Sequence, residues 1–352
     1  MFTIIIPTFE RHFLLHRSID YYKKFDCNIL IADSSVKKMN HVFPDNVAYR
    51  HLPGINFAQK ILLVAETITT PYVCLSADDD YLLESSLKTG ANFLKGNLDF
   101  VSVQGKYLMF ELVDDKIVFS PKYGPDSSYY SVTNEDIYSR LIRAFNPYMH
   151  QIYSLHCKDA FISSLRATIP ISQSSTAMLQ FIISIIPMCH GKHKVLPVLW
   201  MARDSAKFER PDVYLEAPPE ESDYLLLFYH RAFQHQIREF HIFLESEDSQ
   251  VFKKALGIEV SQLISDSKEV DKIFNAAFNS LIKFYRYNRN KVMLKIIIKL
   301  FIPEWVLSYL KKRKPIQHMN GIDKNYFTNI ALNNIRLSIL SFLDVYNNVR
   351  KK

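Results

Sequence analysis

Two short apolar runs separated by an amphipathic stretch open the chain, and this pattern constrains the fold more than any other feature. Residues 2–7 (FTIIIP) are rich in β-branched side chains and stop at a proline, and residues 27–35 (CNILIADSS) form a second run that ends in a small polar turn. Between them, apolar side chains recur at roughly helical spacing over residues 11–25. A strand, a helix and a strand within some thirty residues make a βαβ unit, whose right-handed crossover connects parallel strands. The sequence therefore predicts an α/β domain.

The alternation of strands and helices continues beyond this unit. Residues 47–53 and 71–77 have the composition of short strands, and residues 56–68 between them have helical periodicity. Residues 98–120 alternate between apolar and polar side chains and carry turn signals, which indicates further strands, some of them antiparallel. Helical patterning with few strand signals follows in the last third of the chain.

Length and composition are those of a folded protein with about two domains. The chain has 352 residues, 48% of them hydrophobic and 22% charged, which argues against wholesale disorder. We expect an α/β domain over residues 1–210 and a mostly helical region over residues 211–352. Only 8 glycines are present, and neither the dinucleotide-binding fingerprint nor the Walker pattern occurs.

The cysteines and the N-terminal segment favour a cytoplasmic location. The 4 cysteines are scattered without CxxC spacing, which is typical of reduced thiols in a cytosolic protein. The opening apolar run is too short for a signal peptide, and no window reaches the roughly 18 apolar residues of a membrane span.

Polar side chains follow three of the expected strands, at the point where each strand ends. Residues 7–11 (PTFER), 32–35 (ADSS) and 78–80 (DDD) come directly after apolar runs. In an open α/β sheet, ligands bind at the carboxyl ends of the strands, so these residues are expected to share one rim. Three adjacent carboxylates repel one another, and they fit either a solvated turn or a divalent cation that holds a phosphorylated ligand. The convergence of three polar strand ends favours the metal–nucleotide site.

Four stretches, in this order along residues 2–204, resemble the GT-A glycosyltransferases of the large inverting family two. They are residues 3–15 (TIIIPTFERHFLL), 29–35 (ILIADSS), 57–82 (FAQKILLVAETITTPYVCLSADDDYL) and 190–204 (HGKHKVLPVLWMARD). The chain looks most like a bacterial branch that builds surface polysaccharide. The resemblance implies a Rossmann-like mixed sheet. It also implies transfer of a sugar from a nucleotide diphosphate donor, UDP-linked, to a glycan or lipid-linked glycan acceptor in capsule, O-antigen or lipooligosaccharide synthesis.

The resemblance also implies roles for individual residues. The nucleotide pocket would contain Pro7, Thr8, Phe9, Glu10, Arg11, Asp33, Ser34, Lys60, Asp78, Asp79 and Arg203. In it, Phe9 would stack near the base, Asp33 would accept a hydrogen bond from the imide of uracil, and Lys60 would reach base or phosphate. A packed aromatic residue, a turn-forming aspartate and a lysine on a solvated helix face remain the alternatives. Arg203 would pair with phosphate, or else form an ordinary surface salt bridge.

The acidic residues Asp78, Asp79 and Asp80 are the expected metal ligands. In the family's pattern one aspartate contacts the ribose and another binds Mg²⁺ or Mn²⁺, which bridges the diphosphate. The ion would screen the carboxylates and stabilise the departing nucleoside diphosphate as a Lewis acid. The motif aligns in two registers, so the direct ligand among the three is left open.

A general base is missing from its usual place. Inverting members carry a carboxylate after the acceptor loop, but residues 160–203 contain no Asp or Glu, and Gln180 stands near the expected position. Asp159 is the first candidate, and the other candidates are Asp204, Glu135, Asp136, His150 and His156. A retaining enzyme or an anionic acceptor would need no such base. Two alternatives therefore stay open: transfer of another activated group, such as an alditol phosphate, and a catalytically silent GT-A scaffold in an assembly complex.

The basic residues gather at the end of the chain. Residues 281–352 hold fifteen Lys and Arg against three acids, a net charge of +12, whereas the whole chain carries +7. Over residues 290–314, a basic helical stripe, an apolar face, aromatic residues and a polybasic cluster suit a helix on an anionic leaflet. This would place the protein peripherally on the inner face of the plasma membrane. A helix packed on its own core and an oligomer contact are the alternatives, and nucleic acid is disfavoured because the stretch matches no recognised module.

Overall fold

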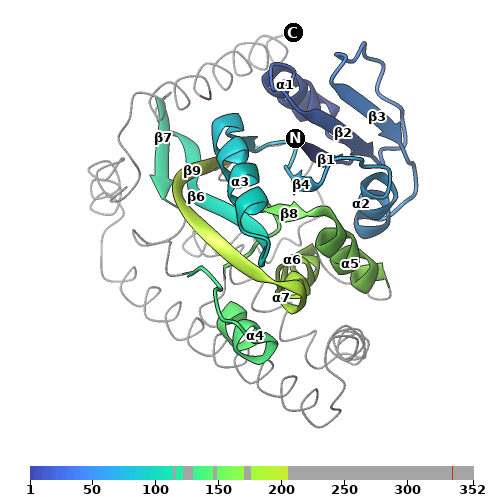
Figure 1. The fold of residues 1–352 in the computed structure, drawn as a ribbon. Coiled ribbons are helices and arrows are strands. Elements are labelled where there is room, and N and C mark those ends of the chain that lie inside the picture. The colour runs from blue at the N-terminus through green and yellow to red at the C-terminus, as the bar shows by residue number, and fades with distance from the viewer. Residues whose placement is uncertain (114–115, 122–129, 146–148, 170–175, 205–334, 336–352) are drawn as a thin grey trace, which may run out of the picture.

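The computed structural model describes residues 1–113, 116–121, 130–145, 149–169, 176–204 and 335 (Figure 1). The predicted helical region over residues 211–352, with the basic stretch 290–314, therefore lies outside the described residues, except for the buried Ile335. Among the described helices, none combines the length and the apolar character that crossing a bilayer requires.

The described chain alternates strands and helices. The strands are β1 (Phe2–Thr8), β2 (Asn28–Asp33), β3 (Val47–His51), β4 (Tyr72–Leu75), β5 (Tyr81–Leu82), β6 (Phe100–Val113), β7 (Lys116–Pro121), β8 (Leu155–Cys157) and β9 (Lys192–Asp204). The helices are α1 (His12–Tyr22), α2 (Phe57–Ala65), α3 (Glu84–Gly96), α4 (Ile137–Phe145), α5 (Lys158–Thr168), α6 (Thr176–Ile185) and α7 (Pro187–His190).

All the strands belong to one sheet of mixed direction. Its order is β3-β2-β1-β4-β8-β6-β9-β5, and β7 pairs with β6 outside this path. The first four strands are parallel to one another, β8 is antiparallel to both of its neighbours, and β6 and β9 are again parallel. The predicted α/β domain with a Rossmann-like mixed sheet is thus confirmed.

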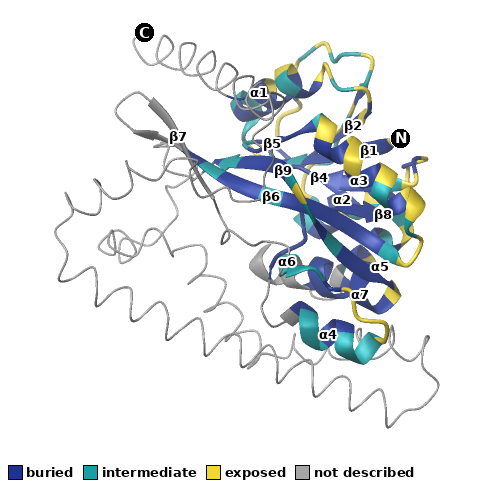
Figure 2. Cartoon of the chain, turned by 60° about the vertical axis from the view of Figure 1, so that its left-hand side comes forward, coloured by how far each residue is buried: buried dark blue, intermediate teal, exposed yellow. Residues whose placement is uncertain are grey.

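The first strand is buried on both of its faces. Ile4, Ile5 and Ile6 are fully buried, and consecutive strand residues point to opposite faces of a sheet. Helices therefore cover both faces here, as the continuous apolar run predicted. In Figure 2, strands β1, β2, β4 and β8 are mostly buried, and most of the exposed residues lie on loops and outer helix surfaces. This packing holds the carboxyl ends of β1, β2 and β4 in fixed positions.

Strand β8 is shorter than the composition of the residues around it suggests. Residues 150–157 (HQIYSLHC) have a strand-like composition, but only Leu155–Cys157 pair as β8. A turn precedes β8, in which the amide of Ser154 donates to the carbonyl of Gln151 at 2.9 Å. This turn carries His150 and Tyr153 toward the carboxyl end of β4, because Leu155 pairs with Cys74.

Candidate functional site

The carboxyl ends of β1, β2 and β4 meet at one rim, as the sequence predicted. Thr8 at the end of β1 pairs with Asp33 at the end of β2. On the other side of β1, the amide of Ser76 donates to the carbonyl of Ile5 at 2.9 Å. The hydroxyl of Thr8 also donates to Asp78 Oδ2 at 2.7 Å, so it joins the end of β1 to the acidic segment, residues 78–80.

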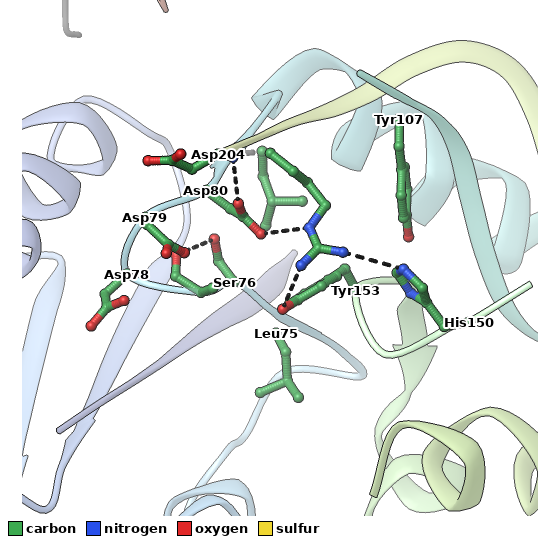
Figure 3. Close-up of polar contacts among 12 residues, drawn as sticks. Leu75, Ser76, Asp78, Asp79, Asp80, Tyr107, His150, Tyr153 and Asp204 are labelled. Atoms are coloured by element: carbon green, nitrogen blue, oxygen red, sulfur yellow. Dashed lines mark hydrogen bonds and ion pairs between the residues drawn. The ribbon is translucent and has the colours of Figure 1, made fainter. Parts of the chain in front are cut away.

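Each aspartate of the acidic segment has a different set of partners. Asp78 Oδ1 and Asp79 Oδ2 lie 2.8 Å and 2.5 Å from the same nitrogen of Arg11. Asp80 accepts from Arg203 Nε at 2.9 Å and from the amide of Asp204 at 3.1 Å. In Figure 3, Asp78 and Asp80 point in different directions. Two arginines thus offset the repulsion that three adjacent carboxylates would otherwise create.

Burial has the largest effect on the pKa of Asp80. Its side chain is 2% exposed, and this burial raises the pKa of Asp80 to about 6, while the Arg203 guanidinium and the Asp204 amide oppose the rise. Burial would lower the pKa of Arg11, but Asp79 and Asp78 hold it above its usual value. The carboxylates of the acidic segment are therefore partly desolvated, and their charge states depend on the two arginines beside them.

The described residues contain no group of three or more His, Cys, Asp and Glu side chains arranged to hold a metal ion. A cage built from protein side chains alone is therefore not formed by this part of the chain. Mg²⁺ usually takes only one or two carboxylates and completes its shell with phosphate oxygens and water. Asp79 and Asp80 supply the one or two carboxylates that a metal of that second kind would need.

Arg203 connects the acidic segment to residues that lie before β8. One of its terminal nitrogens lies 3.2 Å from His150 Nε2, and its guanidinium carbon lies 4.7 Å from the centre of the Tyr153 ring (Figure 3). Arginine stays protonated, so His150 Nε2 is the acceptor in this contact. Arg203 therefore forms a salt bridge at the rim of the sheet, with the buried Asp80, and not the ordinary surface salt bridge that was its alternative.

Lys60 lies at the rim but is buried. This residue of α2 is 2% exposed. Its ammonium group donates to the Thr8 carbonyl at 2.5 Å and to Ser34 Oγ at 2.9 Å. Burial lowers the pKa of Lys60 to about 8, against the attraction of Asp33 and Asp78. The solvated helix face that was its alternative is therefore wrong, and Lys60 ties the ends of β1 and β2 together.

The loop after β1 places an aromatic ring in solvent at the rim. Phe9, which follows Pro7 and Thr8, is 58% exposed, so the alternative of a packed aromatic residue is wrong. Glu10 has φ of 52°, a left-handed conformation that is uncommon for a residue other than glycine. Its amide donates to Ser35 Oγ at 2.8 Å and its carboxylate accepts from the Val36 amide at 2.7 Å, which holds the strained turn against the end of β2.

Asp33 is enclosed by side chains that the sequence did not single out. Its carboxylate accepts from Tyr49 at 2.6 Å and from the amide of Ser35 at 2.8 Å, and it lies 2.7 Å from His12 Nε2. These hydrogen bonds lower the pKa of Asp33 despite its burial. The only local sequence feature that could have pointed to His12 as a site residue was its position directly after the polar strand end 7–11.

The structure places Asp159 away from this rim. Asp159 follows Lys158, whose amide donates to the carbonyl of Pro71 at the start of β4, whereas the acidic segment follows the end of that strand. The expectation that Asp159 acts as the base is therefore wrong. Glu135 also lies far from the rim, because it pairs with Lys192 at the start of β9, eleven residues before Arg203. At about 3.3 Å per residue, the two ends of β9 are more than about 30 Å apart.

Two other candidates for the base lie in the wrong surroundings, and two lie at the rim. Asp136 caps α4 by accepting from the Ser139 amide at 2.7 Å, and α4 packs on α7 before β9 begins. His156 is fully buried, bonds the Gln151 carbonyl at 2.8 Å, and has a pKa lowered by burial to about 4. His150 and Asp204 remain beside Arg203 and Asp80.

Comparison with known proteins gives similarity at the level of solved structures only. No protein-family model matches the chain, and no curated protein matches it. Solved structures of Staphylococcus aureus TarS are similar. The form spanning residues 1–349 aligns with a TM-score of 0.43 and 14% identity over 81% of this chain and 89% of that one. Its complexes with UDP-GlcNAc and with UDP align with TM-scores of 0.43 and 0.42, each at 15% identity and the same coverage. Similarity of this size assigns no function to the chain.

Proposed function

We propose that this chain is a glycosyltransferase that moves a sugar from a UDP-linked donor to a glycan acceptor in bacterial surface polysaccharide synthesis. The observation that carries the proposal is the meeting of an exposed aromatic ring, Phe9, with the acidic segment and two arginines at the carboxyl rim of a parallel sheet. This rim is where open α/β sheets bind nucleotides. The residues that meet there are those that the resemblance assigned to the nucleotide pocket.

The rim offers separate surfaces for the parts of a nucleotide diphosphate. Phe9 provides a ring on which a base stacks, and the side chains at the end of β2 lie at the edge of that base. Arg11 and Arg203 supply guanidinium groups, which bind phosphate oxygens through charge-assisted hydrogen bonds. When a diphosphate takes over these guanidinium groups, the carboxylates of the acidic segment lose their arginine partners and become ready to bind ribose hydroxyls or a cation.

A divalent cation, Mg²⁺ or Mn²⁺, belongs to the proposal. Asp79 or Asp80 would hold it together with the diphosphate, and Asp78, bonded to Thr8, would face the ribose. The ion supplies Lewis-acid stabilisation of the leaving nucleoside diphosphate. The burial that raises the pKa of Asp80 also makes this carboxylate depend on a nearby positive charge.

The acceptor hydroxyl would lose its proton to His150 or Asp204. In this structure Arg203 donates to His150 Nε2 at 3.2 Å. If Arg203 turns toward phosphate, that nitrogen is released and can accept a proton from the acceptor.

The proposal is tested by nucleotide-induced shifts in melting temperature, with and without Mn²⁺. We expect UDP to stabilise the protein more than CDP, GDP or ADP, and Mn²⁺ to increase the shift. Asp80→Asn should remove the metal-dependent part, because an amide cannot replace the carboxylate as a ligand. The matched control is Asp20→Asn, which changes an exposed aspartate on α1 that pairs with the neighbouring Lys23.

The outcomes separate the open alternatives. A UDP shift that is equally large without metal and in Asp80→Asn would contradict the metal site. Binding of UDP without transfer from any UDP-sugar would favour the silent scaffold, and transfer only from an activated alditol phosphate would favour the other group-transfer reaction.

A further inference from the structure

The carboxylate of Asp33 has no free face toward a ligand. Its side chain is 0% exposed, and Oδ2 lies 2.6 Å from the Tyr49 hydroxyl and 2.7 Å from His12 Nε2. The other oxygen, Oδ1, accepts from the Ser35 amide at 2.8 Å. A base could therefore bond Asp33 directly only after one of these groups has moved away.

Two of the three partners are held in place by further contacts. The Ser35 amide belongs to the backbone. Tyr49 accepts from the Met39 amide at 3.0 Å, and its ring stacks on Phe43 with the centroids 4.7 Å apart. His12 is the partner that reaches solvent, because its side chain is 27% exposed. His12 thus covers Asp33 on the side from which a ligand would approach.

The hydrogen bond to Asp33 also determines what His12 presents. With Nε2–H donating to the carboxylate, a neutral imidazole has its acceptor at Nδ1. None of the described residues hydrogen-bonds Nδ1 of His12, whose bond to Asp33 runs through Nε2. Arg11, the preceding residue, bonds Asp78 and Asp79, so His12 adjoins the residue that contacts the proposed phosphate end of the site.

We propose that His12 reads the base, with Nδ1 accepting the ring N–H, and that Asp33 is a positioning residue that orients the imidazole. The inference rests on the proposed function and names its substrate class. These nucleotides have a base with a ring N–H that can donate to Nδ1. Cytosine and adenine carry an unprotonated acceptor nitrogen at the corresponding ring position. Uracil and thymine meet this requirement at N3, and guanine meets it at N1. A direct contact between Asp33 and the base is the reading that this inference replaces.

The test compares UDP, N3-methyl-UDP and CDP by isothermal titration on the full chain. The wild-type protein is expected to bind UDP about tenfold to a hundredfold more tightly than the other two nucleotides, the effect of leaving one buried polar group unpaired. His12→Phe, which keeps a ring but no acceptor, should weaken UDP by a similar factor and bind all three nucleotides alike. His12→Gln, whose amide can both donate and accept, should restore part of the preference.

His16→Phe is the matched control, because His16 lies one turn further along α1 and its ring contacts His41, not Asp33. This variant should retain the wild-type preference. If His12→Phe keeps the preference while Asp33→Asn loses it, Asp33 reads the base directly and the inference is overturned. The inference also fails if the wild-type protein binds UDP and N3-methyl-UDP equally. If the wild-type protein binds no nucleoside diphosphate, the proposed function itself fails. Melting curves of each variant show whether lost binding reflects lost folding.

Discussion

Single buried charges at the rim depend on partners from distant parts of the sequence. Asp80 and Arg203 are 123 positions apart, and each is largely removed from water. Removal of one partner would leave the other charged and desolvated, which in proteins costs more than the pair contributes. The acidic segment is therefore tolerated at the strand end because β9 delivers an arginine to it.

The buried histidines His156 and His193 predict how stability depends on pH. Burial lowers the pKa of His156 to about 4 and that of His193 to about 3. The unfolded chain takes up protons on these side chains below about pH 6.5, and the folded chain does not until lower pH. The free energy of unfolding should therefore fall as the pH falls from about 6.5 to 4, by up to about 1.4 kcal/mol per pH unit for each histidine.

Urea unfolding at pH 7.5, 6 and 5 measures this slope. The double variant His156→Gln/His193→Gln should flatten it, whatever its stability at neutral pH, because neither glutamine titrates. His190→Gln, which changes an exposed histidine of the same region, should leave the slope unchanged. An unaltered slope in the double variant would show that His156 and His193 do not cause the pH dependence of stability.

At the scale of elements, the pairing of β6 with β9 positions the second half of the site. Arg203 and Asp204 end β9, and they pair with Met109 and Phe110 of β6. The register shifts at two places around Gly105, where Gln104 pairs with Val195 but Lys106 pairs with Leu199. This irregularity sets which residues of β9 arrive at the rim.

Gly105→Ala should disturb that pairing. A Cβ at position 105 would collide with the Val198 carbonyl oxygen, which belongs to the backbone of β9 and cannot rotate away. We expect a loss of roughly 1–3 kcal/mol in unfolding free energy, together with weaker UDP binding through a displaced Arg203. Gly96→Ala, at the end of α3 where a Cβ meets nothing within 4 Å, should be neutral or slightly stabilising. Denaturant unfolding and nucleotide titration measure the two effects in each variant. Equal effects of the two variants would contradict the inferred clash at position 105.

Local sequence patterns predicted the elements well but not the contacts between them. The apolar runs predicted β1, β2 and β4, and the rule for parallel sheets predicted that their polar ends converge, because both features depend on periodicity alone. The partners of Asp33, Asp78 and Asp80 were not predicted. Hydrogen bonds between residues far apart in the sequence leave no periodic signal, and a histidine in the first turn of a helix is locally indistinguishable from a surface residue.

The expected base shows the same limit. Asp159 is the first candidate from the sequence because Gln180, near the expected position, cannot act as a base. The short strand β8 runs antiparallel to β4 and carries the residues after it to the far end of the sheet. His150, at the other end of β8, reaches the rim for the same reason. Strand direction, which composition does not reveal, decided between these two candidates.

At the scale of the whole molecule, charge is divided unevenly along the chain. The last 72 residues carry +12, whereas the total is +7, so the remainder is net negative. A basic segment at the end of an otherwise net negative chain suits a protein that approaches an anionic surface. The segment 290–314 remains a predicted membrane contact, since it lies outside the described residues.

Vesicle flotation tests this contact. The full chain should float with vesicles that contain phosphatidylglycerol but not with vesicles of phosphatidylcholine, and binding should be lost near 1 M salt, where the screening length is about 3 Å. Changing Lys311, Lys312, Arg313 and Lys314 to Gln should abolish flotation at physiological salt, since each basic residue contributes about 1 kcal/mol near an anionic surface. The matched control changes four exposed lysines of the α/β domain, Lys23, Lys24, Lys37 and Lys38, by the same substitution. Both variants have the same net charge, so loss of flotation in both would assign it to overall charge, whereas loss in the first alone would assign it to the basic segment.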